Sequence, residues 1–115
     1  MCTFQVDWSE YYAASHEKPL HPTFGWIEPH LPSGRKAYDL GCGVGHGTQW
    51  LVQHGFEVTA VDCEQEALEL TSARVGDPAP VQYVWSDFTS LSMEPCDIVV
   101  AQFSLFFLPR LGQDR

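Results

Sequence analysis

Basic residues are scarce in this chain of 115 residues. Six Lys and Arg stand against 15 Asp and Glu, and the formal net charge is −9. Proteins that bind a phosphate backbone or an anionic membrane surface need clustered basic side chains. We therefore expect neither nucleic acid nor a membrane among the partners.

Long hydrophobic runs are also missing. The longest, 98–108, is interrupted by Gln102 and Ser104, and it is shorter than the roughly 18–20 residues that span a bilayer. The opening MCTFQVDWSEYY has neither the basic start nor the apolar core of a secretory signal. The sequence therefore predicts a cytoplasmic protein.

Cysteine does not form a recognisable framework. The four residues, Cys2, Cys42, Cys63 and Cys96, have spacings that fit neither a zinc clip nor a compact set of disulfides. Even if Cys42 and Cys63 ended neighbouring strands, two thiols without further ligands would make a poor zinc site. We expect free thiols in a reducing compartment and no bound metal.

The composition that remains is that of one globular domain, with 44% hydrophobic and 13% aromatic residues. Residues 1–34 are rich in aromatic residues, His and Pro, and form a predicted helical segment. One short helix begins at Asp7 or Ser9, and a second, capped by Thr23, covers 24–31. The second ends at Pro32-Ser33-Gly34.

Residues 35–115 alternate between strand and helix patterns. Strands are predicted at 37–40, 58–61, 81–85 and 98–101, and helices at 48–54 and 64–75. This alternation is typical of an open α/β fold with a parallel sheet. Right-handed crossovers would place the carboxyl ends of its strands at one edge, where such sheets bind ligands.

A glycine-rich turn follows the first predicted strand and reads DLGCGVGHGT. Glycine at alternate positions lets backbone approach a ligand closely, and the next helix directs its free N–H groups into the same space. The dinucleotide fingerprint G-x-G-x-x-G fails in every register, because its third glycine would fall on His46, Thr48 or Trp50.

Two acidic residues end the next predicted strands. Asp62 lies 21 residues beyond Gly41, where a carboxylate can accept hydrogen bonds from both hydroxyls of a ribose; the alternative is a helix cap. Asp87 and Phe88 follow the third strand, where they could hold an adenine through its amino group and ring. Ordinary turn formation is the alternative for this pair.

The segments AYDLGCGVGHGT, VTAVD, SDF and CDIVVAQFSLFF resemble class I S-adenosylmethionine-dependent methyltransferases, in order and spacing those of the tellurite-resistance type. The resemblance implies a doubly wound, mainly parallel Rossmann-like sheet with strand order 3-2-1-4. The family's sheet usually has seven strands, so we expect a sheet truncated after the fourth. Residues 35–115 would then form the cofactor-binding half of the domain, with 1–34 as a helical lid.

The resemblance also implies a set of residues around S-adenosylmethionine, from the methionine end through the ribose to the adenine and the transferred methyl. These are Asp39, Gly41, Cys42, Gly43, Asp62, Cys63, Asp87, Phe88 and Gln102, with Phe103 near the methyl. Trp8 and Tyr12 are the candidate lid residues.

No catalytic residue is predicted, because an activated sulfonium needs mainly alignment and exclusion of water. His16, His21 and His30 are candidate bases, with surface or packing roles as the alternative. His46 is interpreted as positional.

The predicted function is in-line methyl transfer to a small-molecule acceptor. Two alternatives stay open. One is a non-catalytic cofactor-binding module. The other is an interaction protein that associates, for example with itself, through the edge of the fourth strand.

Overall fold

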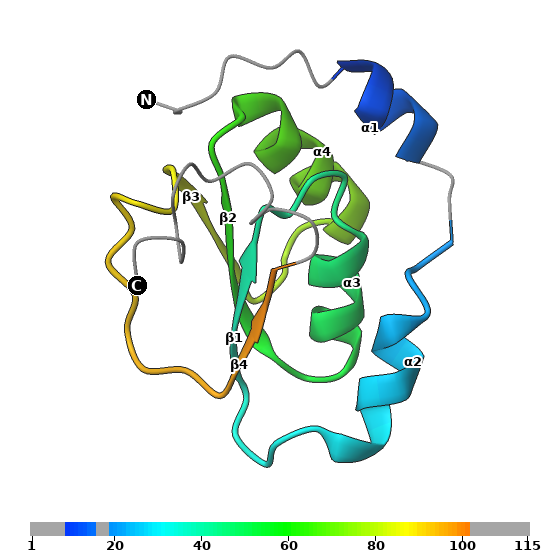
Figure 1. Cartoon of the computed structure of the whole chain (residues 1–115), viewed down its shortest axis with the longest axis vertical. Helices are drawn as coiled ribbons and strands as arrows, with labels where there is room; N and C mark the ends of the chain where they lie inside the picture. Colours follow the sequence, from blue (N-terminus) through cyan, green and yellow to red (C-terminus); the bar gives the residue numbers. More distant parts are fainter. Residues whose placement is uncertain (1–8, 16–18, 102–115) are drawn as a thin grey trace, which may run out of the picture.

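The computed structural model describes residues 9–15 and 19–101, and within them the chain folds around one sheet (Figure 1). All strand pairs are parallel and the order is β3-β2-β1-β4. The strands are β1 (Lys36–Leu40), β2 (Glu57–Asp62), β3 (Val81–Trp85) and β4 (Ile98–Val100). The predicted fold class and strand order are confirmed.

Two helices make the crossovers on one face of the sheet. Helix α3 (His46–Gln53) joins β1 to β2, and α4 (Gln65–Val75) joins β2 to β3. Segment 86–97, which leads from β3 to β4, runs along the opposite face (Figure 1). The carboxyl ends of β1 and β2 therefore meet the amino ends of α3 and α4 at a single edge.

Glycines follow both crossover helices, directly after the predicted helical ranges 48–54 and 64–75. Gly55 follows α3 with φ 88°, and Gly76 follows α4 with φ 87°. A positive φ costs glycine little, and at Gly55, just past the C-cap of α3, it is a common way for a helix to end. The start of α3 differs from the prediction, because the helix begins at His46 rather than Thr48 and includes Gly47.

The N-terminal segment contains α1 (Ser9–Ser15), α2 (Thr23–Ile27) and the 3-10 helix η1 (Glu28–His30). The prediction of one helix over 24–31 was wrong, because Pro29 lacks the N–H that an α-helix needs and the chain tightens into η1. Thr23 is not the cap either, since Pro22 holds that position. Asp7 lies outside the described residues.

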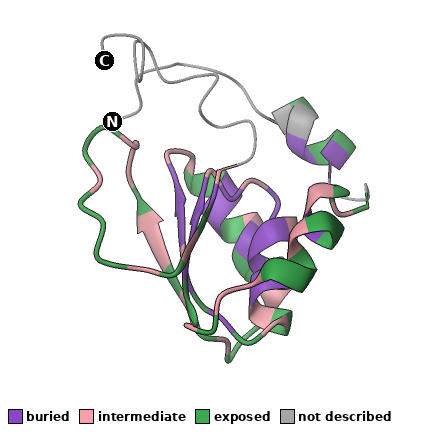
Figure 2. Cartoon of the chain, turned by 60° about the horizontal axis from the view of Figure 1, so that its bottom comes forward, coloured by how far each residue is buried: buried purple, intermediate pink, exposed green. Residues whose placement is uncertain are grey.

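The core lies between the sheet and the helices, where buried residues concentrate (Figure 2). Its main cluster consists of Phe24, Ala37, Trp50, Leu51, Phe56, Val58 and Val100. Phe24 of α2 is 1% exposed, and its ring centroid lies 4.9 Å from that of Trp50. The N-terminal segment thus supplies part of the same core as the sheet.

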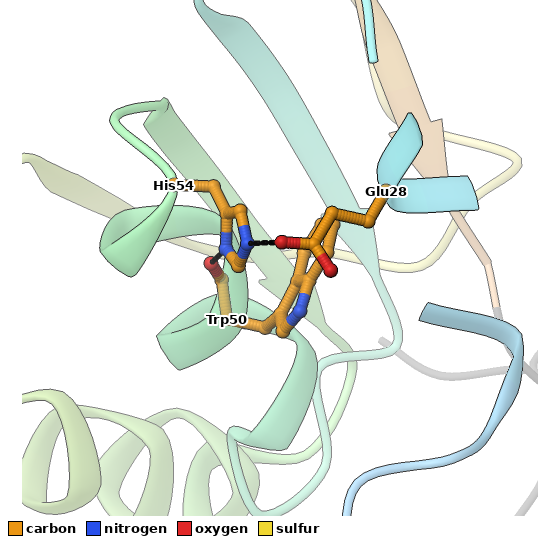
Figure 3. A network of polar contacts seen from close by, with 3 residues as sticks. All are labelled: Glu28, Trp50 and His54. Carbon is orange, nitrogen blue, oxygen red and sulfur yellow. Dashed lines mark hydrogen bonds and ion pairs between the residues drawn. The ribbon is translucent and has the colours of Figure 1, made fainter. Parts of the chain in front are cut away.

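A polar contact joins η1 to the end of α3 (Figure 3). The His54 ring stacks on Trp50 at 3.9 Å between centroids, with Nδ1 2.8 Å from the Trp50 carbonyl oxygen. Its Nε2 lies 3.0 Å from Glu28 Oε2. The pKa of His54 is raised, first by the Trp50 carbonyl and then by Glu28, while burial opposes the rise.

Among residues 9–15 and 19–101, no helix has both the length and the apolar character to cross a bilayer. The same residues bring together no group of three or more His, Cys, Asp and Glu side chains that could hold a metal ion.

Candidate functional site

The glycine turn lies at the carboxyl edge of the sheet, between β1 and α3. Gly41, Gly43 and Gly45 have φ values of 78°, 58° and 96°. The backbone N–H groups of Gly41 and Cys42 donate to the Val61 carbonyl at 2.7 and 3.2 Å, which ties the turn to the end of β2. The predicted turn is therefore built from left-handed glycines beside the second strand.

The glycines of the turn face different surroundings. A Cβ placed on Gly43 would meet nothing within 4 Å, so this backbone is open to a ligand. A Cβ on Gly45 would lie 2.9 Å from the Thr71 Cα, so this glycine allows α4 to pack closely. Of these two glycines, Gly43 is the one that a ligand could reach.

Asp39 lies beneath the turn and is buried. The Thr48 hydroxyl donates to its Oδ2 at 2.7 Å, and a Cβ on Gly47 would lie 3.1 Å from the same oxygen. Burial raises the pKa of Asp39 to about 6 and the charge of Asp62 adds to the rise, whereas hydrogen bonds from Thr48 oppose it. Asp39 therefore supports the turn from inside.

Asp62 ends β2 and bridges two segments of the edge. Its Oδ2 accepts from the Gly43 N–H at 3.1 Å, and its Oδ1 accepts from the Glu64 N–H at 3.0 Å. Burial raises its pKa, while these backbone donors act against the rise. The cap position of α4 is Glu64 rather than Asp62. A carboxylate offers about four acceptor sites, and the backbone N–H groups of Gly43, Glu64 and Cys63 all act on this one.

The two cysteines predicted at the site point to different roles. Cys42 is buried, and its Sγ lies 3.2 Å from the Thr71 hydroxyl oxygen, so its side chain packs toward α4. Cys63 is partly buried beside Asp62, and its carbonyl accepts from the Trp85 indole N–H at 3.0 Å. Cys42 contributes its backbone to the turn, and Cys63 lies between the ends of β2 and β3.

Asp87 and Phe88 both make contacts within the protein. Asp87 Oδ1 accepts from the Thr89 hydroxyl at 2.9 Å and the Ser90 N–H at 2.8 Å, and these bonds lower its pKa. Phe88 packs with a cluster that includes Tyr38 and Leu40, on the face of the sheet away from α4. These contacts are the turn chemistry that the sequence left as the alternative, and an adenine contact stays a prediction.

Tyr12 lies over the glycine turn. Its ring is 5% exposed and packs with Val44 of the turn and Ala67 of α4. Burial raises its pKa, and the nearby negative charge of Asp62 adds to that rise. The structure thus brings one of the two candidate lid residues to the predicted site.

Two residues of α4 hold the turn although sequence reasoning gave them other roles. The Thr71 hydroxyl donates to the Gly43 carbonyl at 3.1 Å, and the Arg74 Nε–H donates to the Val44 carbonyl at 2.8 Å. Helical spacing in 64–75 places Thr71 on one stripe with Leu68 and Val75. Arg74 near the end of the helix suits the helix dipole. Only the register of α4 against the turn reveals their second role.

Several candidates lie elsewhere or outside the described residues. Gln102, Phe103, Trp8 and His16 are in the latter group. His21 accepts from the Thr23 N–H at 3.1 Å, which is a local backbone contact. His30 ends η1, near the amino end of β1 and thus at the opposite end of the molecule from the glycine turn (Figure 1).

A cavity of about 870 Å³ opens on the other face of the sheet, between the strands and segment 86–97. Tyr38, Thr59, Gln82 and Leu91 are among its lining residues, whereas the glycine turn and Asp62 are not. This cavity is therefore separate from the glycine turn and the Asp62 side chain, although its lining reaches Ser86 just after β3.

Comparison with known proteins agrees with this geometry. A family model described as a methyltransferase domain matches residues 38–113. The chain therefore belongs to the methyltransferase domain family, whose match begins inside β1 and includes the turn and Asp62.

Individual relatives match over most of this chain but over a minor part of their own length. The cypemycin N-terminal methyltransferase of Streptomyces sp. is 32% identical over 92 residues, covering 78% of this chain and 37% of the relative. A carboxy-S-adenosyl-L-methionine synthase of Aeromonas hydrophila is 32% identical over 80 residues, covering 64% and 32%. The chain thus spans about a third of these two relatives.

A solved structure shares the fold. A TehB-like SAM-dependent methyltransferase from Corynebacterium glutamicum superposes with a TM-score of 0.69 at 23% identity. The match covers 93% of this chain and 57% of that one. The predicted resemblance to tellurite-resistance-type methyltransferases is confirmed at the level of the fold.

Proposed function

We propose that this chain binds S-adenosylmethionine at the glycine turn and, in a methyltransferase, presents its methyl group to a small-molecule acceptor. The observation that carries the proposal is the pairing of Gly43 with Asp62. The Gly43 backbone is open, and its N–H lies 3.1 Å from the Asp62 carboxylate. Open backbone beside an acidic strand end suits a nucleoside whose ribose hydroxyls donate hydrogen bonds.

The residues fit the cofactor in charge as well as in shape. S-adenosylmethionine supplies a methyl group on a positively charged sulfur. Asp62 places an acidic group beside the turn, Asp39 lies buried beneath it, and Tyr12 covers the turn from α1. The chain's own contribution is to bind, orient and exclude water, which is what an already activated methyl group requires.

Calorimetry with S-adenosylmethionine and S-adenosylhomocysteine tests cofactor binding. Asp62→Asn removes the charge and one acceptor, so affinity should fall roughly 5- to 150-fold, as expected for one or two hydrogen bonds to ribose. Glu69→Gln makes the same charge change on the exposed side of α4 and should bind as wild type does. Equal affinity of all three proteins would remove Asp62 from the site.

A methyl-release assay with candidate acceptors separates an enzyme from a non-catalytic binding module. The two relatives are named for different reactions, an N-terminal methylation and the synthesis of carboxy-S-adenosyl-L-methionine, so the acceptor has to be found by experiment. Binding without turnover under every condition would favour the module.

A further inference from the structure

His46 links the start of α3 to the end of helix α1. It is the first residue of α3, and its Nε2 lies 3.0 Å from the carbonyl oxygen of Ser15, the last residue of α1. A carbonyl only accepts hydrogen bonds, so Nε2 carries the proton and donates it. The contact joins residues that are 31 positions apart in the sequence.

The first position of a helix does not by itself favour a histidine. The positive end of the helix dipole disfavours a cationic ring at this position, and α3 has no side-chain cap at its start. The ring therefore makes its polar contact outside its own helix, with the end of α1.

Helix α1 brings Tyr12 over the cofactor site. Tyr12 is buried against Val44 and Ala67, close enough to Asp62 for that charge to affect its pKa. Ser15 follows one helical turn later and is 8% exposed. A donor that holds the Ser15 carbonyl thus fixes the end of the helix that carries the Tyr12 ring.

We propose that His46 is a positioning residue that holds α1 against the glycine turn and so keeps Tyr12 over the ribose end of the cofactor site. This inference rests on the proposed function for its role in binding. The docking of α1 by His46 stands on the geometry of the chain alone.

Hydrogen–deuterium exchange tests the docking without any ligand. His46→Phe keeps a ring but loses the donor, and exchange of the α1 amides at 12–15 should become about fivefold faster, the effect of one lost hydrogen bond. His46→Gln supplies a side-chain N–H and should restore slow exchange. His30→Phe, the same change on exposed η1, should leave α1 unchanged.

Dissociation of S-adenosylhomocysteine, followed by stopped flow, tests the effect on the site. It should be about fivefold faster from His46→Phe than from wild type, with Gln again restoring the slow rate. If wild type binds no cofactor, the proposed function fails while the exchange experiment still decides the docking. Two results would overturn the inference. One is α1 exchange that is unchanged in His46→Phe, and the other is fast α1 exchange in both His46→Phe and His46→Gln.

A measurement on the wild-type chain covers the case in which His46→Phe does not fold. Nitrogen NMR of the imidazole should show the proton on Nε2 of neutral His46. A neutral ring with its proton on Nδ1 contradicts the hydrogen bond to Ser15.

Discussion

At the scale of single residues, the buried Asp39 makes the stability of the fold depend on pH. Its carboxyl is buried beneath the turn and has a pKa of about 6. The ordinary pKa of aspartate is about 4. Between pH 4 and pH 6, folding is therefore coupled to the uptake of a proton by Asp39. The stabilising contribution of the protonated group is full below pH 4 and is lost as the pH rises through 6.

Asp39→Asn should remove this dependence, because the amide resembles the protonated carboxyl and can still accept from Thr48. We expect the variant to exceed wild type in free energy of unfolding by up to roughly 3 kcal/mol at pH 8 and to converge with it near pH 4. Urea unfolding at pH 4.5, 6 and 8 measures this difference, with the exposed Asp77→Asn as control. Lower stability of Asp39→Asn at pH 8 would mean that the carboxylate is stabilising.

At the scale of elements, patterns within a segment were predictable and contacts between segments were not. The β-branched run before Asp62 predicts β2, and the glycines after α3 and α4 predict the ends of those helices. Local conformational preference decides all three features. The start of α3 at His46 depends on Gly47 fitting against Asp39 and Phe24, and no local pattern records that fit.

The candidate site divides in the same way. The left-handed turn and Asp62 follow from the order of motifs along the chain. The roles of Thr71, Arg74 and His46 depend on how α4 and α1 lie against the turn. Such contacts join residues far apart in sequence, so a single sequence contains no period or spacing that predicts them.

The contact between η1 and α3, made by Glu28 and His54, depends on pH. Both ring nitrogens of His54 lie next to acceptors, the Trp50 carbonyl and the Glu28 carboxylate. A neutral imidazole has one N–H and can satisfy one of them, whereas the imidazolium donates to both. Its position at the end of α3 also favours the cation through the helix dipole.

Glu28→Gln should therefore lower the pKa of His54, because the ring loses the carboxylate that favours its charged form. The stabilising effect of Glu28 should be complete below about pH 6.5, the ordinary histidine pKa, and should disappear as the pH rises through the pKa of folded His54. Proton NMR titration of His54 measures the first effect and urea unfolding the second, with Glu69→Gln as control. An unchanged His54 pKa would show that Glu28 does not contact the ring in solution.

At the scale of the whole molecule, the two faces of the sheet differ. The helices α2, α3 and α4 bury one face, while segment 86–97 only partly covers the other and leaves the cavity of about 870 Å³. Val99 of β4 belongs to this second face, beside Tyr38 in the sheet register, and is 47% exposed. In the described part of the chain, β4 pairs only with β1 and therefore forms an edge of the sheet.

An open edge with an apolar flank favours pairing with another strand, and we predict that two copies of this chain associate there. Val99→Lys should weaken that association tenfold or more, because burying a valine contributes roughly 1.5–3 kcal/mol and an edge lysine opposes pairing. Sedimentation equilibrium over a range of concentrations measures the dissociation constant. Gln82→Lys provides the control, since Gln82 is exposed on the same face of β3, the strand at the other edge of the sheet from β4. Wild type that stays monomeric at high concentration, or equal weakening by both variants, would contradict association through β4. Cofactor affinity should be the same in all three proteins, because Val99 lies on the opposite face of the sheet from α3 and α4.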